Sequence, residues 1–309
     1  MKNKTNFMTK TWVIVVGAMI CCTLWGSAFP CIKIGYRMME IAAADTASQI
    51  LYAGYRFTLA GVLTIVLGSI LQRKILLPKR SAIGKIGLLS LLQTVLQYLF
   101  FYIGLAHTTG VKASIIEAVS TFVAILVAGY LFHQETVTSR KMLGCLIGFA
   151  GVVLVNVAGS GMDFHFSPAG DGCILLSTVA YAFSSVCMKR FSQKEDPVML
   201  SGYQFILGGI VMIACGVAMG GHLKAFTASA AALLIYMAMI SAVAYSLWGM
   251  LLKYNPVSKV TVFGFMNPVI GVILSALLLN ETESLGVSSV LALGLVCVGI
   301  YIVNAKAKE

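Results

Sequence analysis

The stretch YSLWGMLLKYNPVSKVTVFGFMNPVIGVILSALLLNE, residues 245–281, decides the fold class of this chain. It contains an apolar segment that ends at Leu252, a polar break at residues 253–259, and a second apolar segment that runs through Asn267 and Pro268 to Glu281. Two apolar segments joined by a short polar turn predict a helical hairpin.

The same hairpin occurs earlier in the chain. A shift of 146 positions lays the hairpin that ends at Glu135 over the one that ends at Glu281, without a gap. Identical residues then meet at Leu105/Leu251, Val111/Val257, Val123/Val269, Leu131/Leu277, Glu135/Glu281 and Thr136/Thr282. Just beyond, the segment GVVLVN at 151–156 reappears as GIYIVN at 299–304. We interpret the chain as a duplication of one half.

Composition places the chain in a membrane. Hydrophobic residues make up 59% of the 309 residues and charged residues only 11%, which is too little polar surface for a soluble domain of this size. A bilayer core needs about 20 apolar residues per helix. Segments near that length occur at residues 12–34, 49–71, 84–106, 111–132, 142–160, 172–190, 198–219, 229–252, 258–279 and 287–304. The prediction is an all-α integral membrane protein with ten transmembrane helices.

The net charge of +11 is distributed unevenly along this topology. If each segment crosses the membrane once from a cytoplasmic N-terminus, 17 Lys and Arg residues lie in cytoplasmic segments and only three, Arg37, Lys112 and Lys224, lie at the outer face. This asymmetry is typical of membrane proteins and predicts that both termini are cytoplasmic. The lipid bilayer of the cell inner membrane is therefore the expected partner of the basic residues, and a nucleic acid is not.

Five helices per half is an odd number. The first half, residues 12–160, and the second half, residues 172–304, are therefore expected to be inverted relative to each other in the membrane. Inverted repeats of this kind are typical of secondary transporters, in which two halves enclose one central site and expose it to each side in turn.

Trp25 and Tyr181 occupy matching positions in the two halves. A shift of 156 positions superposes Trp25, Cys31 and Lys33 on Tyr181, Cys187 and Lys189. Two interpretations of the two aromatic side chains remain open: they line a central cavity from opposite halves, or they pack at helix interfaces.

Arg56 and Glu117 are ionisable residues at membrane depth. Such residues cost about 2.5 to 3.5 kcal/mol at a helix centre and are usually paired or in contact with water. Both lie roughly 10 Å below the same membrane face, at 1.5 Å per residue. We expect them to face the interior, as an outer-gate ion pair or as a polar wall of the solute pathway. A static pair between the second and fourth helices, and proton coupling through Glu117, are the alternatives.

The third segment carries further polar and aromatic residues. Gln93, Gln97 and Phe101 share one helix face, and amides that face lipid would lack partners, so this face is expected to point inward. For any one of these aromatic rings packing is the better explanation, but as a set, with a few hydrogen-bonding groups, they suit an amphiphilic organic solute. The candidate substrate-binding residues are Trp25, Gln97, Tyr98, Tyr102, Tyr181, Tyr203, Trp248 and Asn267.

Other classes of site are disfavoured. The four histidines are scattered over connectors on both sides, no glycine-rich loop follows a strand, and the eight cysteines show no paired spacing. We therefore expect no metal, no cofactor, no disulfide framework and no enzyme activity. Glu135 and Glu281 are expected to cap or bridge the ends of neighbouring helices.

Several short motifs together resemble a known family. They are Trp25-Gly26-Ser27 with Lys33 eight residues after the tryptophan, the two Glu-Thr steps, and Asn267-Pro268. With the duplicated ten-helix plan, they resemble the EamA-type members of the drug/metabolite transporter superfamily over residues 12–304. The resemblance implies an exporter or exchanger of small metabolites, often amino acids, with a cavity formed mainly by helices 1, 3, 4, 6, 8 and 9.

One position departs from the family pattern. The proline thirteen residues before the closing glutamate is present as Pro268, but Phe122 stands at the matching position of the first half. The fourth helix is therefore expected to be straighter than the ninth. A flippase of a lipid-linked substrate and, less favoured, a membrane-embedded enzyme are the alternative functions; the first would need a polar groove that reaches lipid.

Overall fold

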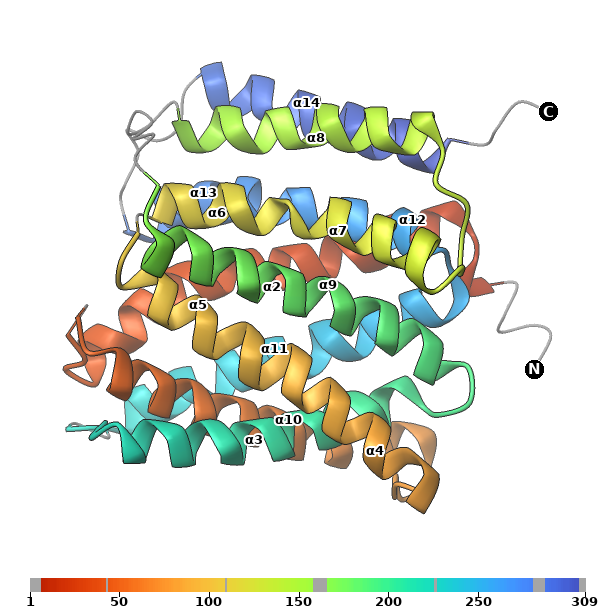
Figure 1. Cartoon of the computed structure of the whole chain (residues 1–309). Coiled ribbons are helices and arrows are strands. Elements are labelled where there is room, and N and C mark those ends of the chain that lie inside the picture. Colours follow the sequence, from red (N-terminus) through yellow and green to blue (C-terminus); the bar gives the residue numbers. More distant parts are fainter. Residues whose placement is uncertain are drawn as a thin grey trace.

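The computed structural model describes residues 7–42, 44–108, 110–157, 166–224, 227–279 and 287–305, and every regular element in these ranges is helical (Figure 1). The elements are α2 (Thr11–Met38), α3 (Thr46–Gln72), α4 (Arg80–Leu89), π-helical η1 (Ser90–Leu96), α5 (Gln97–Leu105), α6 (Gly110–Ala118), α7 (Ser120–Leu126), π-helical η2 (Val127–Leu131), α8 (Ser139–Val157), π-helical η3 (Pro168–Gly172), α9 (Cys173–Ser192), α10 (Pro197–Ala218), α11 (Ala228–Tyr254), α12 (Val257–Thr261), 3-10 helix η4 (Val262–Phe265), α13 (Met266–Leu279) and α14 (Val287–Asn304). The prediction of an all-helical chain is confirmed.

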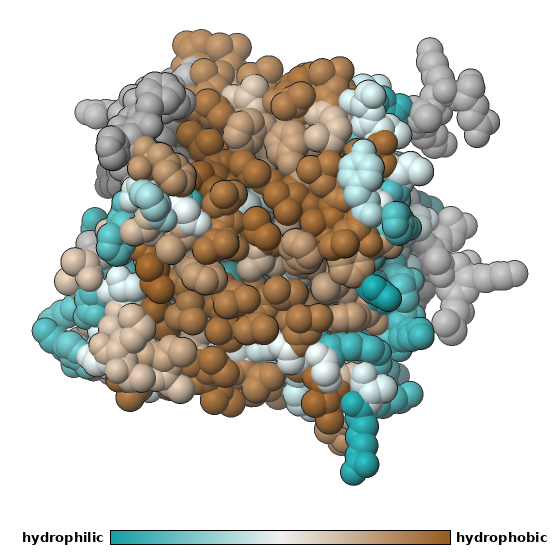
Figure 2. All heavy atoms as spheres, in the orientation of Figure 1, coloured by the Kyte–Doolittle hydropathy of each residue, from teal (hydrophilic) through white to brown (hydrophobic). Residues whose placement is uncertain are grey.

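Six helical segments among the described residues are long and apolar enough to cross a membrane: 11–38, 46–72, 80–105, 168–192, 197–218 and 228–254. Figure 2 shows a hydrophobic band across the middle of the molecule, with hydrophilic residues at both ends. Large apolar side chains on its surface include Leu71, which is 83% exposed, and Tyr301, which is 73% exposed. Such a band is stable against lipid and would aggregate in water.

Basic residues gather at one end of the bundle. In Figure 1, α2 begins and α14 ends at the same end, which we call the basic end. The described connections and helix ends there carry Lys10, Arg73, Lys74, Lys79, Arg140, Lys194 and Lys253. The other end, which we call the opposite end, carries the described connection residues 39–42, 44–45, 106–108, 219–224 and 227.

The fourth and ninth segments, which the sequence predicts as single helices, are irregular. In the ninth, α12 gives way to η4 just before Pro268, because the proline lacks the N–H that would bond to the Gly264 carbonyl. The fourth segment has no proline but is not regular either: α6 ends at Ala118, and the Val119 N–H bonds to the Ile116 carbonyl at 3.0 Å. The fourth segment is therefore not a regular helix, although it lacks the proline of the ninth.

Glycines bring two helix pairs into backbone contact on the flanks of the bundle. In the α3–α10 pair, a Cβ at Gly61 would lie 2.5 Å from the Gly202 carbonyl oxygen. In the α8–α14 pair, a Cβ at Gly144 would lie 2.9 Å from the Gly299 carbonyl oxygen. Small residues permit this close approach of membrane helices. Apart from α3, which carries Arg56, the helices that line the site lie between these two flanking pairs (Figure 1).

The substitution Gly61→Ala is expected to lower the thermal stability of the purified protein. The added methyl group would overlap backbone atoms of α10, which costs typically 1–3 kcal/mol. The matched control is Gly84→Ala in α4, where no atom lies within 4 Å of the added Cβ. Helix propensity alone makes alanine more favourable than glycine by about 1 kcal/mol. The melting temperature should therefore fall for Gly61→Ala and not for Gly84→Ala; equal shifts would contradict the close contact.

Candidate functional site

A cavity of about 160 Å³ lies inside the bundle. Its walls come from helices of both halves of the sequence. The lining residues are Trp25, Ala28, Ile32, Arg56, Gln97, Tyr98, Phe101, Tyr102, Glu117, Ala118, Ser120, Thr121, Ala124, Ser177, Thr178, Tyr181, Tyr245, Thr261, Gly264, Asn267 and Pro268. The three α2 residues all lie in its second half, so the cavity extends from the middle of the bundle toward the opposite end.

Most of the residues selected from the sequence lie together at this cavity. Trp25, Gln97, Tyr98, Tyr102, Tyr181 and Asn267 line it, and so do Arg56 and Glu117. Tyr203 and Trp248 do not line it. Trp248 is 2% exposed and packs edge-on against Trp25 at 5.0 Å between ring centroids, and Tyr203 packs against the apolar core. For these two residues the structure shows packing.

Arg56 is held in place by two neighbours. Its Nη2 donates a hydrogen bond to Ser241 Oγ of α11 at 3.0 Å, and its guanidinium carbon lies 5.1 Å from the centre of the Phe57 ring. The residue is 3% exposed. A buried guanidinium with remaining donors is well suited to bind an anionic group.

Glu117 lies on α6 and lines the same cavity as Arg56. Within the part of the chain that the structure describes, ion pairs join Lys85 to Glu195 and Lys141 to Glu135, and none joins Arg56 to Glu117. The outer-gate ion pair and the static pair are therefore not formed here. The geometry is that of a polar wall: a guanidinium and a carboxyl group line one cavity without direct contact.

Aromatic rings form the apolar part of the wall. Trp25 packs edge-on against Tyr245 at 5.0 Å between centroids, and the Tyr98 and Tyr245 hydroxyl groups are hydrogen-bonded at 3.0 Å. The Tyr98 ring lies 4.4 Å from that of Phe57. Tyr245 thus joins α11 to α2 and α5 at the cavity. Tyr245 was not among the residues selected from the sequence, although it lies one turn from Trp248.

Among the described residues, four buried polar atoms of the cavity lining have no hydrogen-bond partner: Trp25 Nε1, Arg56 Nε, Gln97 Oε1 and Asn267 Oδ1. Two are donors and two are acceptors. A buried polar atom without a partner costs about 1–3 kcal/mol, so this wall is complete only with a polar ligand or water in the cavity.

Hydroxyl groups also line the cavity, and Thr121 does so where the fourth and ninth segments meet. Thr121 Oγ1 of α7 donates to the Thr261 carbonyl of α12 at 3.1 Å. Ser120, Ser177 and Thr178 add further hydroxyls to the lining. These hydroxyl residues were not among the candidates selected from the sequence. The one available signal was spacing, since Thr121 follows Glu117 by four residues and so shares its helix face.

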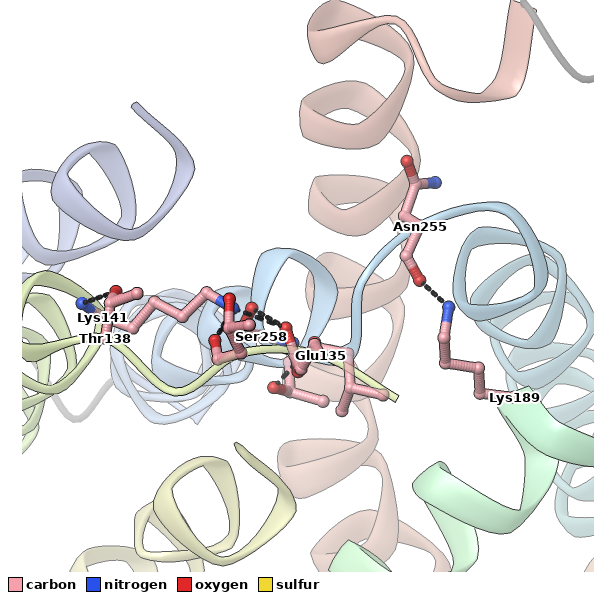
Figure 3. Close-up of polar contacts among 9 residues, drawn as sticks. Glu135, Thr138, Lys141, Lys189, Asn255 and Ser258 are labelled. Carbon is pink, nitrogen blue, oxygen red and sulfur yellow. Dashed lines mark hydrogen bonds and ion pairs between the residues drawn. The ribbon is translucent and has the colours of Figure 1, made fainter. Parts of the chain in front are cut away.

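Glu135 bridges neighbouring helix ends, as predicted. Its carboxylate accepts hydrogen bonds from the Ser258 N–H at 2.8 Å, from Ser258 Oγ at 2.5 Å and from Lys141 Nζ at 2.8 Å (Figure 3). Its counterpart Glu281 lies outside the described residues.

One carboxylate outside the membrane-spanning segments has a shifted pKa. Asp45 precedes α3 and accepts a hydrogen bond from the Ser48 N–H at 2.9 Å. Hydrogen bonds from the Ser48 side chain and backbone lower the pKa of Asp45. This is a helix cap with a structural role.

The model of the EamA-like transporter family matches residues 12–157 and again residues 168–305. The chain belongs to this family. It is therefore a membrane transporter of the drug/metabolite transporter superfamily, as the short motifs indicated. Both matched stretches contribute residues to the cavity.

Relatives of this EamA-like chain include an "Uncharacterized transporter" of Archaeoglobus fulgidus, 28% identical over 96% of this chain and 99% of the relative. The inner membrane transporter YedA of Escherichia coli K12 is 28% identical over 92% of this chain and 90% of its own length. A WAT1-related chloroplastic protein of Arabidopsis thaliana is 25% identical over 95% of this chain and 69% of its own length. A solved crystal structure superposes with a TM-score of 0.77 at 16% identity, over 94% of this chain and 96% of the other, and shows the same fold.

Proposed function

We propose that this EamA-like chain is a secondary transporter that exports a small zwitterionic solute with an apolar side group, such as an amino acid. The observation that carries the proposal is the cavity itself, in which Arg56 and Glu117 face one volume without pairing. A solute with a carboxylate and an ammonium group would satisfy both charges at once. Either charge alone would be costly to keep at membrane depth.

The roles of the remaining cavity residues follow from their chemistry. Arg56 binds the carboxylate, Glu117 binds the ammonium group, and the ring faces of Trp25, Tyr98 and Tyr181 contact the apolar part. Tyr102 completes the aromatic wall. The unpartnered Gln97 Oε1 and Asn267 Oδ1 accept hydrogen bonds from the solute or from its water. A volume of about 160 Å³ limits the solute to a small molecule.

The proposal includes the topology behind alternating access. Ten membrane-crossing segments form two inverted five-helix repeats, residues 12–160 and 172–304, and the basic end faces the cytoplasm. The helical segments 110–131, 139–157, 257–279 and 287–304 supply the four crossings beyond the six long apolar helices. The positive charge at the basic end supports the orientation.

A lipid-linked substrate is less well supported. A flippase needs a polar groove that opens to lipid. The surface groove on α2 is lined by Val15, Val16, Met19, Ile20, Thr23 and Leu24 and offers a single hydroxyl.

The test is counterflow in proteoliposomes that contain the purified protein. Labelled amino acids would be compared with matched analogues that lack the carboxylate or the ammonium group, with and without a proton gradient. Zwitterions should be exchanged at least about tenfold faster than either analogue, because each lost charged hydrogen bond is worth about 1.5–3 kcal/mol. Equal rates for all three would overturn the assignment of a zwitterion, and no exchange of any would overturn transport of this class.

A further inference from the structure

The basic end of the bundle is closed by a polar cluster that joins the two halves of the sequence. We call Glu135, Lys141 and Ser258 the latch (Figure 3). Glu135 lies between η2 and α8 in the first half, and Ser258 lies in α12 in the second half. Ser258 donates both its N–H and its hydroxyl to the Glu135 carboxylate, and Lys141 Nζ donates to the same carboxylate and, at 2.6 Å, to the Thr136 carbonyl.

The latch is buried although it lies at the end of the bundle. The side chains of Glu135 and Lys141 are 5% and 15% exposed, and Ser258 is fully buried. A carboxylate removed from water in this way depends on its hydrogen-bond partners. The bridge therefore forms only when the two halves are in close contact at this end.

A second set of contacts holds the other side of the α11–α12 turn. Lys189 Nζ of α9 donates to the Leu252 carbonyl at 3.2 Å and to the Asn255 carbonyl, at the C-terminal end of α11. Asn255 Nδ2 donates to the Met8 carbonyl at 3.1 Å, next to the start of α2. Figure 3 shows the α11–α12 turn between Lys189 on one side and Glu135 on the other.

The space between the latch and the cavity is filled by packed apolar side chains. Thr261 and Ala124 are the lining residues nearest the basic end, and beyond them Val257, Val260 and Ala128 are fully buried in one apolar cluster. A solute in the cavity is separated from the basic end by these packed side chains of the described residues. It reaches the basic face only if the α11–α12 turn separates from the connection between η2 and α8.

We propose that Glu135 is the latch residue of a gate at the basic end, whose release from Ser258 opens the cavity to that face. This inference rests on the proposed alternating access. Separation exposes the Glu135 carboxylate and the Ser258 N–H and hydroxyl to water, which replaces their hydrogen bonds. Because hydrogen bonds to water replace those within the latch, the closed state is favoured by only a small free energy and the gate can still open.

The experiment measures access to the cavity from each face and needs no knowledge of the solute. A variant with all eight native cysteines replaced would carry Ala124→Cys, and vesicles of both orientations would be treated with a membrane-impermeant maleimide. Lys74→Cys and Lys224→Cys, at exposed sites of the basic and opposite ends, identify which face is labelled. Glu135→Gln should raise the labelling rate from the basic face about tenfold, because one charged acceptor is lost. Ser258→Ala, which keeps the backbone N–H, should raise it less.

The matched control is Asp196→Asn at the same end. It removes one carboxylate charge but keeps the cap on α10, which Asp196 forms with the Val198 and Met199 N–H groups. Its labelling should equal that of the parent. A partly unfolded Glu135→Gln protein would be labelled faster from both faces, whereas an opened gate is labelled faster from the basic face and more slowly from the opposite face.

Unchanged labelling in Glu135→Gln, or faster labelling from both faces, would overturn the latch. Failure of the zwitterion assay together with the expected labelling shift would overturn the proposed solute and leave the gate in place. The two proposals therefore fail separately.

Discussion

Arg56→Gln should lower the transport of a zwitterionic amino acid in proteoliposomes about 100-fold, since truncating one partner of a buried charge pair costs about 2–5 kcal/mol. The guanidinium is 3% exposed and lines the cavity, so a bound carboxylate would meet it without competition from bulk water. Arg56→Lys keeps the charge but loses the planar pair of donors. Its transport rate should lie between those of the parent protein and of Arg56→Gln.

The specificity of the Arg56 effect depends on two controls. Arg37→Gln makes the same change at an exposed position near the end of α2 and should leave transport unchanged. The analogue without a carboxylate should be transported equally by the parent and by Arg56→Gln. If the variant loses both solutes to the same extent while its melting temperature is unchanged, Arg56 does not bind the carboxylate.

Ser241 tests the placement of the guanidinium. Ser241→Ala removes the 3.0 Å hydrogen bond that ties Arg56 to α11 but leaves its charge in the cavity. Transport should fall about tenfold, in line with the loss of one hydrogen bond to a charged group worth about 1.5 kcal/mol. A loss as large as that of Arg56→Gln would mean that the Ser241 contact, and not the charge, determines transport.

The all-helical membrane class and the positions of the helices were predictable from the sequence, because both depend on local composition. Apolar length determines a membrane helix, and a hydrophobic segment such as 229–252 predicted α11 (Ala228–Tyr254) within a few residues. The polar residues of the cavity were also predictable, because Gln97, Arg56 and Glu117 cannot face lipid without cost. Residue type and depth in the membrane are sufficient for this prediction.

The parts that were not predicted depend on direction around the helix and on neighbours. Depth alone suggested that Arg56 could meet Glu117. However, α3 begins at Thr46, three residues before the predicted start, which moves Arg56 by about 4.5 Å along its helix. Trp248 and Tyr245 differ by three positions in α11, yet one is packed and the other lines the cavity. Hydroxyls such as Thr121 are common in membrane helices and give no distinguishing signal.

The π-helix η1 explains why one predicted face is divided. Gln93, Gln97 and Phe101 were expected to share a face, but η1 ends at Leu96, between Gln93 and Gln97. The wider turn rotates the two ends of the segment relative to each other. Gln97 and Phe101 line the cavity, whereas Gln93 is buried outside the lining.

Glu117→Gln should also lower zwitterion transport about 100-fold, since it removes the only carboxylate in the described cavity lining. The amide keeps the shape of the side chain but cannot neutralise an ammonium group. Glu117→Asp should recover part of the rate. Glu40→Gln, which removes an exposed carboxylate at the opposite end, should leave transport unchanged.

The same variant decides between binding of the ammonium group and proton coupling. If Glu117 binds the ammonium group, Glu117→Gln loses both exchange and accumulation of the zwitterion, and the analogue that lacks the ammonium group is unaffected. If Glu117 carries the coupling proton, the variant still exchanges the zwitterion across the membrane but no longer accumulates it against a proton gradient. We expect the first result, because the cavity places Arg56 and Glu117 around one volume and a zwitterion fills both roles. Exchange that persists while accumulation is lost would assign Glu117 to the proton instead.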